Sequence, residues 1–257
     1  MAPHPIAAQK AISIKIIRFP LFVKDLATWV LGDPHCYEEI VESLNLSNVE
    51  CLKFGLSKGL GLGIVFGGCI VKIPQIIVIL RARSTRGISL VSYLLETFAY
   101  FITIAYNIRD RNAFSTWGEA LLIAVQNVFI VMLMKFFKRK RFDAIMVLLV
   151  SFLIGYVMTD HEIVSEGVMS LLMALTIPVI LLSRVPQIYT TYQHGSTGNI
   201  SLFTVFNYFL GTAGRVYTTY QEVDDKLIQL GNVLAFLLNA IVLAQTLYYR
   251  NVPVKQA

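Results

Sequence analysis

The sequence predicts an all-α integral membrane protein with seven transmembrane helices, and three observations carry this prediction. Of 257 residues, 56% are hydrophobic and only 15% are charged, whereas a soluble domain has roughly 45–50% apolar and about 25% charged residues. Several apolar runs approach the roughly 20 residues that a helix needs to cross a bilayer. One segment containing a Pro-Gln dipeptide also occurs twice.

The apolar runs define the seven predicted spans. Unpaired backbone groups are so costly in lipid that only helices and closed barrels cross it, and these runs are too long for barrel strands of roughly 9–11 residues. The predicted spans are Leu56–Leu80, Ser89–Asn107, Trp117–Phe137, Phe142–Met158, Gly167–Tyr189, Ser201–Tyr220 and Leu227–Tyr249.

The charged loops predict the orientation of the chain. Lysine and arginine mark the cytoplasmic loops of membrane proteins, so the net charge of +6 does not indicate a nucleic-acid partner. The basic loop residues are Arg81, Arg83, Arg86, Lys135, Lys138, Arg139, Lys140, Arg141, Arg250 and Lys255. The opposite loops contain Arg109, Asp110, Arg111, Asp160, Glu162, Glu222, Asp224, Asp225 and Lys226. We therefore expect a lumenal N-terminus and a cytoplasmic C-terminus.

The cysteines and the N-terminal segment leave two questions open. Cys36 and Cys51 fall in the predicted lumenal segment, where a disulfide can form, but spacing alone does not show that two sulfur atoms meet. Cys69 falls inside the first span. Apolar residues at helical spacing before Cys36 fit either an interfacial helix or a poorly ordered tail.

An internal repeat is the most informative feature of the sequence. The chain reads VKIPQIIVILRARSTRGISL around Pro74 and SRVPQIYTTYQHGSTGNISL around Pro186, an offset of 112 positions. Without a gap, Gln75 matches Gln187, and Lys72 matches Arg184 with its charge preserved. Asn127 and Asn239 are separated by the same offset.

The offset predicts two three-helix repeats in the same orientation. A repeat of three helices ends on the side of the membrane opposite to the one where it began. One linker helix returns the chain to the starting side, so the second repeat begins on the same side as the first. The predicted organisation is a lumenal segment over 1–53, a first repeat over 54–141, a linker helix over 142–160, a second repeat over 161–250 and a cytoplasmic tail over 251–257.

The two Pro-Gln pairs are candidate hinges. Proline removes a helix hydrogen bond and clashes with the preceding turn, so Pro74 and Pro186 predict kinks near the cytoplasmic ends of the first and fifth spans. We include Gln75 and Gln187 in this hinge. The alternative is that each proline merely marks a helix end.

The doubled unit resembles the PQ-loop repeat superfamily, which includes lysosomal cystine and cationic amino-acid transporters and is related to the SWEET sugar carriers with their parallel repeats. Within it, the ordered motifs are similar to the mannose-P-dolichol utilization defect branch over roughly residues 35–250. The matching motifs are SKGLGLGIV, VKIPQ, GISL, LLE, FSTWGEA, VPQI, HGSTG and ISLFTVF. The resemblance implies an endoplasmic-reticulum protein required to use dolichol-phosphate-mannose and dolichol-phosphate-glucose. Those donors serve N-glycans, O- and C-mannosylation and glycosylphosphatidylinositol anchors.

Charged residues within spans are costly and suggest function. Lys72 and Arg184 are candidate contacts for the lipid phosphate, although both could snorkel to the interface. Glu96 lies deep in the second span and could either pair with a lysine or arginine inside the bundle or face a water-filled cavity. Arg215 is similarly deep and has no acidic neighbour in its own span.

Amide side chains within the spans have two interpretations: they could bind a sugar or bridge helices. The amides are Gln126, Asn127, Asn207, Asn232 and Asn239. Asn127 and Asn239 are the symmetric pair, and we group Asn127, Asn207 and Asn239 with Glu96 and Arg215 as a candidate sugar-binding cavity.

The sequence contains no catalytic, phosphate-loop or metal-binding motif, so we predict a protein that is not an enzyme and uses no cofactor or metal. Gly59, Gly63 and Gly67 predict a close helix-packing face instead. Three functions compete: handling of dolichol-linked sugars, transport of amino acids or sugars, and a chaperone or scaffold for lumenal glycosyltransferases. A lateral opening with cations at its mouth would favour the first, a closed polar cavity the second, and neither feature the third.

The predicted orientation can be tested at two glycosylation sequons. Asn199 begins a sequon in a predicted cytoplasmic loop and should stay unmodified, whereas Asn45 begins one on the lumenal side. Glycosidase shifts of Asn45→Gln and Asn199→Gln variants measure this. Glycosylation at Asn199 would overturn the orientation.

Overall fold

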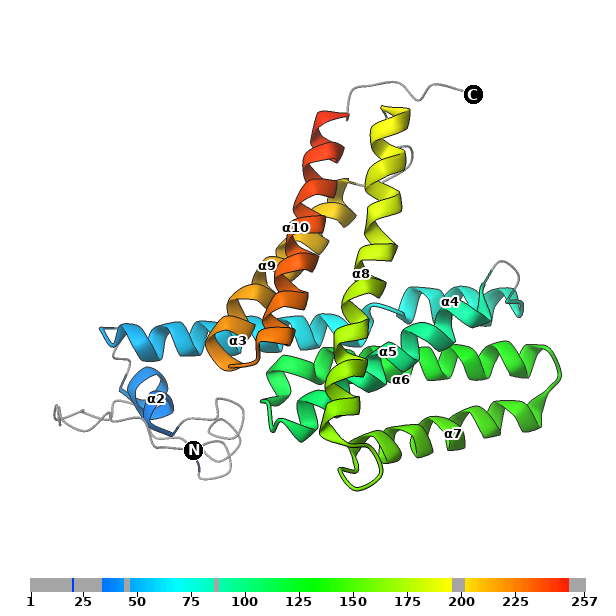
Figure 1. The fold of residues 1–257 in the computed structure, drawn as a ribbon, viewed down its shortest axis with the longest axis horizontal. Coiled ribbons are helices and arrows are strands. Elements are labelled where there is room, and N and C mark those ends of the chain that lie inside the picture. Colours follow the sequence, from blue (N-terminus) through cyan, green and yellow to red (C-terminus); the bar gives the residue numbers. More distant parts are fainter. Residues whose placement is uncertain (1–19, 21–33, 44–46, 86–87, 196–201, 250–257) are drawn as a thin grey trace. The chain divides into compact units, whose positions relative to one another are not determined.

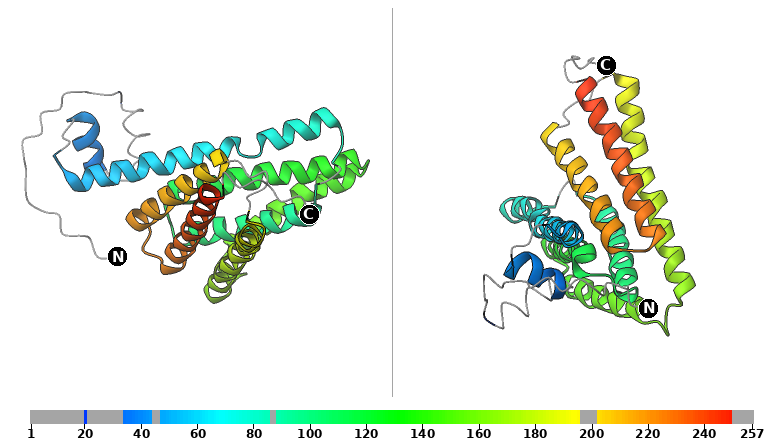
Figure 2. Two further views of the ribbon diagram at one scale, coloured as in Figure 1. Left: turned by 90° about the horizontal axis from the view of Figure 1, so that it is seen from above. Right: turned by 90° about the vertical axis from the view of Figure 1, so that its left-hand side faces the viewer.

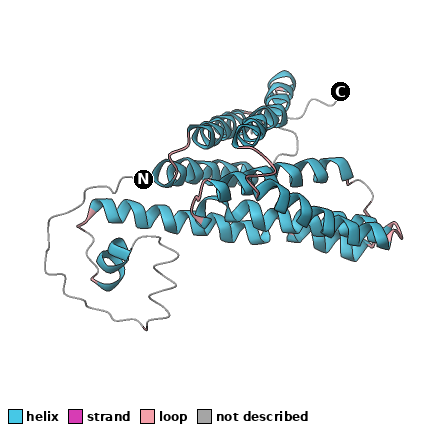
Figure 3. Ribbon diagram, turned by 60° about the horizontal axis from the view of Figure 1, so that its bottom comes forward, coloured by secondary structure: helices cyan, strands magenta, loops and turns pink. Residues whose placement is uncertain are grey.

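The computed structural model describes residues 20, 34–43, 47–85, 88–195 and 202–249, and the regular elements in this part are all helices (Figure 3). The side chains at positions 34, 141, 180–184, 186, 187, 194, 203 and 204 are outside the described part. So are the segment predicted as an interfacial helix or tail, the two sequon asparagines Asn45 and Asn199, and the C-terminal tail after Tyr249.

The chain forms two compact units, residues 1–59 and 60–257. In the first unit, the short helix α2 (Pro34–Tyr37) leads into a π-helical turn, η1 (Glu38–Glu42), and α3 (Val49–Ile70) begins there. The disulfide left open by the sequence is present, with the sulfur atoms of Cys36 and Cys51 2.03 Å apart. Both cysteines and Tyr37 are buried, so the bond ties α2 to the start of α3 in a small core.

A group of possible metal ligands lies at the same place. His35, Cys36 and Cys51 offer ligand atoms within 4.8 Å of one another, and the His35 Nδ1 atom lies 3.8 Å from the Cys51 sulfur. A metal binds cysteine as a thiolate, and these two sulfur atoms are bonded to each other instead. The group is therefore the disulfide with His35 beside it.

In the second unit, the first repeat comprises the end of α3, α4 (Ile73–Ala82), α5 (Leu90–Arg109) and α6 (Phe114–Phe137). Ser89 caps α5 by accepting a hydrogen bond from the backbone N–H of Ser92 (3.3 Å), which satisfies one of the free donors at a helix start. The linker helix α7 (Arg141–Thr159) follows.

The second repeat comprises α8 (Glu166–His194), α9 (Leu202–Glu222) and α10 (Lys226–Tyr248). Asp225 caps α10 by accepting from the N–H groups of Leu227 (2.7 Å) and Ile228 (3.0 Å). Gly195 caps the end of α8, and its φ of +57° is a left-handed conformation that glycine adopts without strain.

In both repeats the third helix contacts the other two. Helix α6 contacts α4 and α5, and α10 contacts α8 and α9; Figure 2 shows α10 between α8 and α9. Helix α7 packs on α5 and α6 (Figure 1). Contacts of α5 with α8 and of α6 with α9 join the two repeats.

Four stretches of the described chain are long and apolar enough to cross a membrane. They are Val49–Ala82, Phe114–Phe137, Phe142–Thr159 and Lys226–Tyr248, with a shorter apolar stretch at Glu166–Val179. The predicted spans Ser89–Asn107 and Ser201–Tyr220 correspond to α5 and α9, which are less apolar. Helices therefore occupy every predicted position, while the count of seven spans stays a prediction.

The prediction that the glycines at four-residue spacing on α3 form a close helix-packing face is wrong. Within the described part of the chain, a Cβ atom added at Gly59, Gly63 or Gly67 would meet nothing within 4 Å. The close approaches are made by Gly61 and Gly68, where an added Cβ would come within 3.0 Å of Ser115 and of Glu119, respectively. The four-residue spacing identified a face of α3, but it is another face that packs on α6.

Candidate functional site

The first Pro-Gln motif lies at a break between two helices. Helix α3 ends at Ile70, Val71 and Lys72 form a turn, and α4 begins at Ile73 with Pro74 in its first turn. Proline cannot donate a backbone hydrogen bond, and its ring clashes with the carbonyl four residues before it. In a continuous helix the Lys72 N–H would donate to the Gly68 carbonyl, so the break leaves both groups needing other partners.

Gln126 of α6 supplies both partners. Its Nε2 donates to the Gly68 carbonyl (2.7 Å), and its Oε1 accepts from the Lys72 N–H (3.0 Å). The amide therefore takes the place of the missing backbone hydrogen bond, and a third contact from Nε2 to the Leu122 carbonyl (2.8 Å) orients it. Of the two interpretations of this amide, the structure shows bridging.

The second repeat differs at the equivalent place. Position 238, which corresponds to Gln126, is leucine, and α8 runs unbroken from Glu166 to His194 through Pro186. Gln245 of α10 donates to the Ile188 carbonyl (3.0 Å), so a glutamine again joins the third helix to the first, but from a non-equivalent position. The side chains of Pro186 and Gln187 lie outside the described part, and Gln75 is half-buried on α4.

Lys72 and Glu96 form an ion pair between the helix break and α5. The Lys72 Nζ atom lies 2.8 Å and 3.0 Å from the two carboxylate oxygens, and 5.3 Å from the centre of the Tyr93 ring. The charge of Lys72 is thus balanced within the protein, and a lipid phosphate would have to displace Glu96. The side chain of its repeat partner Arg184 is outside the described part.

Arg215 joins the two repeats. From α9 its Nη2 and Nε donate to Glu119 Oε2 of α6 (2.7 and 3.2 Å), and its Nη1 donates to the carbonyls of Ser115 and Thr116 (both 2.9 Å). Charge-assisted hydrogen bonds of this kind are the strong ones. Sequence reasoning missed Glu119, although an acid inside an apolar run was a signal for it.

Two further contacts hold the loop ends of the repeats together. Tyr106 donates to Asp225 Oδ2 (2.6 Å), and Ser115 donates to Glu222 Oε2 (2.6 Å). Both acids belong to the predicted lumenal set, and both join the α9–α10 end to the first repeat.

The remaining candidate amides are not gathered in one cavity. Asn232 bridges to Thr219 of α9 (2.9 Å), Asn239 donates to the Ala235 carbonyl of its own helix (3.0 Å), and Asn207 is exposed. Asn127 is completely buried, and neither atom of its amide has a hydrogen-bond partner within the described part of the chain.

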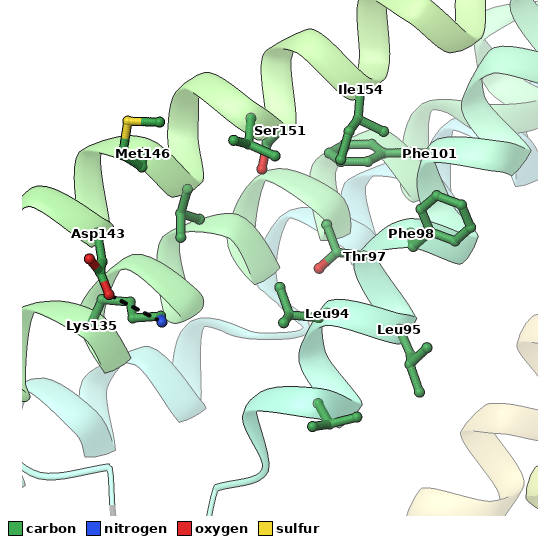
Figure 4. Close-up of a pocket in the computed structure, with 13 residues that line it drawn as sticks. Leu94, Leu95, Thr97, Phe98, Phe101, Lys135, Asp143, Met146, Ser151 and Ile154 are labelled. Carbon is green, nitrogen blue, oxygen red and sulfur yellow. Dashed lines mark hydrogen bonds and ion pairs between the residues drawn. The ribbon is translucent and has the colours of Figure 1, made fainter.

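A groove of about 650 Å³ lies between α5 and α7 (Figure 4). Its lining is apolar apart from Thr97, Ser151 and an ion pair in which Lys135 Nζ lies 3.4 Å from Asp143 Oδ2. Val91, Leu95 and Val150 line it and are largely exposed, so it opens sideways. A second apolar groove of about 550 Å³ lies between α5, α6 and α7.

The fold and these contacts define a multi-pass helical membrane protein built from two equivalent repeats. A family model for the PQ loop repeat matches the chain twice, over residues 56–116 and 168–228. The two matches are offset by the same 112 positions as the sequence repeat. The chain belongs to the PQ-loop repeat family.

The role of Gln126 can be tested with Pro74. Gln126→Leu should lower the free energy of unfolding by about 1–3 kcal/mol, because two partly buried backbone hydrogen bonds lose their partner. In a Pro74→Ala background the loss should be smaller, since α3 can continue into α4 and restore the bond from Lys72 to Gly68. Denaturant unfolding of the protein in detergent micelles measures both values.

Gln245→Leu is the matched control, because it removes a glutamine bond between the same kinds of helices away from the break. Its cost should be equal in both backgrounds. If Gln126→Leu also costs the same with and without Pro74, the amide does not substitute for the interrupted bond.

Proposed function

We propose that this chain is a multi-pass protein of the endoplasmic-reticulum membrane required for the use of dolichol-phosphate-mannose and dolichol-phosphate-glucose. It would move or present these lipid-linked sugars for the synthesis of N-glycans, O- and C-mannose and glycosylphosphatidylinositol anchors, without itself being an enzyme. Its partners would be the dolichol-linked sugars and, on the lumenal side, the glycosyltransferases that consume them.

The observation that carries this proposal is the groove between α5 and α7. It is apolar, it opens sideways between helices, and it has a lysine at one end (Figure 4). A carrier of small polar solutes needs a polar cavity, whereas a lipid with a sugar headgroup needs an apolar surface that is reached from the bilayer. The ordered motifs that resemble the mannose-P-dolichol utilization defect 1 protein support the same assignment.

Two features support the proposed orientation. The Cys36–Cys51 disulfide is a bond that persists in oxidising compartments such as the lumen. The loop after α6 is basic over Lys138, Arg139 and Lys140, as cytoplasmic loops are.

Transport of an amino acid or sugar is the second candidate, and Asn127 favours it. A buried amide without a partner costs about 1–3 kcal/mol, which a polar solute could offset by hydrogen bonding in another conformation. The Asn127 side chain is completely buried, so this function requires the helices around it to open.

Deletion of the gene in a eukaryotic cell tests the proposal. We expect shortened lipid-linked oligosaccharides and loss of mannose-dependent surface anchors, both restored by the intact chain, while dolichol-phosphate-mannose is still made at normal levels. Complete oligosaccharides and normal anchors in the deleted cell would contradict the proposal. A defect confined to uptake of an amino acid or sugar would identify the solute carrier instead.

A further inference from the structure

The groove between α5 and α7 has the length of one membrane leaflet. On α7 its lining runs from Asp143 to Ile154, which at about 1.5 Å per residue is about 16 Å. The hydrocarbon core of a bilayer is about 30 Å thick. A groove that starts at the interface and ends near the midplane fits the chain of a lipid whose headgroup is at that interface.

One face of α7 forms the groove. The contributing positions are 143, 146, 147, 150, 151 and 154, which follow the three- and four-residue spacing of a single helix face. Leu94 and Phe98 of α5 form part of the opposite wall, and Figure 4 shows Phe101 and Ile154 at the end away from the ion pair. The walls offer apolar contact along the length of the groove.

The charged end of the groove fits an anionic headgroup. Lys135 and Asp143 are in contact at 3.4 Å, and their side chains are 26% and 41% exposed. Lys138, Arg139 and Lys140, in the adjoining loop, are exposed. By contrast, Lys72 lies 2.8 Å from Glu96 and is 19% exposed. Lys135 is therefore the more accessible lysine for a phosphate.

We propose that the groove binds the isoprenoid chain of the dolichol-phosphate sugar, and that Lys135 binds its phosphodiester. This inference rests on the proposed function and names its lipid site. Asp143 competes with the phosphate for Lys135, so the ion pair opens when the lipid binds. The basic loop adds attraction for the headgroup at the same interface.

The test uses the full chain in phosphatidylcholine vesicles and a dolichyl-phosphate-mannose analogue with a photoactivatable group in its isoprenoid chain. We expect crosslinks to peptides of α5 and α7. Lys135→Gln should reduce labelling about tenfold, equivalent to about 1.4 kcal/mol of binding free energy. Asp143→Asn should increase labelling, because it removes the competing carboxylate. A purely structural ion pair would make the two variants lose labelling alike, and that result would overturn the proposal.

A second pair of variants separates filling of the groove from damage to the fold. Val147→Trp places a large ring in the groove and should abolish labelling. Leu149→Trp is the matched control, because Leu149 is exposed on α7 and lines neither groove, so labelling should persist. Equal labelling of both tryptophan variants would overturn the groove as the site.

Competition and glycosylation assays distinguish the remaining outcomes. Unlabelled dolichyl-phosphate-mannose should compete, whereas phosphatidylserine should not; equal competition would overturn the assignment to an isoprenoid lipid. If Val147→Trp fully restores oligosaccharides in the deleted cell, the groove inference is wrong although the proposed function stands. If the deleted cell has complete oligosaccharides, the proposed function fails wherever the probe crosslinks.

Discussion

The break between α3 and α4 leaves backbone polar groups within an apolar helix bundle, where an unpaired group is costly because no water can replace its partner. The Gln126 amide meets this constraint by bonding to both Gly68 and Lys72. These two bonds hold α6 against the break between α3 and α4, with Gln126 facing the break. Glu119 on the same helix bonds to Arg215 of α9, and α5 and α7, which form the groove, both pack on α6.

The charged side chains inside the bundle also need partners, as the backbone groups at the break do. Lys72 is paired with Glu96 within the first repeat, and Arg215 is paired with Glu119 between the repeats. An ion removed from water needs a partner and further hydrogen bonds to be tolerated, and Arg215 obtains both from α6. Lys135 and Asp143 form a further pair, which is longer and more exposed than that of Lys72 and Glu96, at the end of the groove that we propose as the lipid site.

Much of the fold could be predicted from the sequence, because it depends on local properties. Apolar runs located the helices, and the 112-residue offset gave the repeats. For Glu96 the sequence left a cation partner and a water-filled cavity open, and the structure shows the partner, Lys72. The partner of Arg215 was missed because it lies 96 positions away, and spacing does not reveal how two distant helices are rotated. The disulfide and the unbroken α8 at Pro186 also depend on three-dimensional packing, as does the face of α3 that meets α6.

The ion pair of Arg215 and Glu119 joins the two repeats, because it satisfies a charge of one repeat with a charge of the other. A double-mutant cycle on Arg215→Gln and Glu119→Gln, measured by denaturant unfolding in detergent micelles, tests it most directly. We predict that each single change destabilises the protein, because it leaves a charge unpaired, and that the double change costs less than the sum by at least about 1 kcal/mol. Additive losses would contradict the claim.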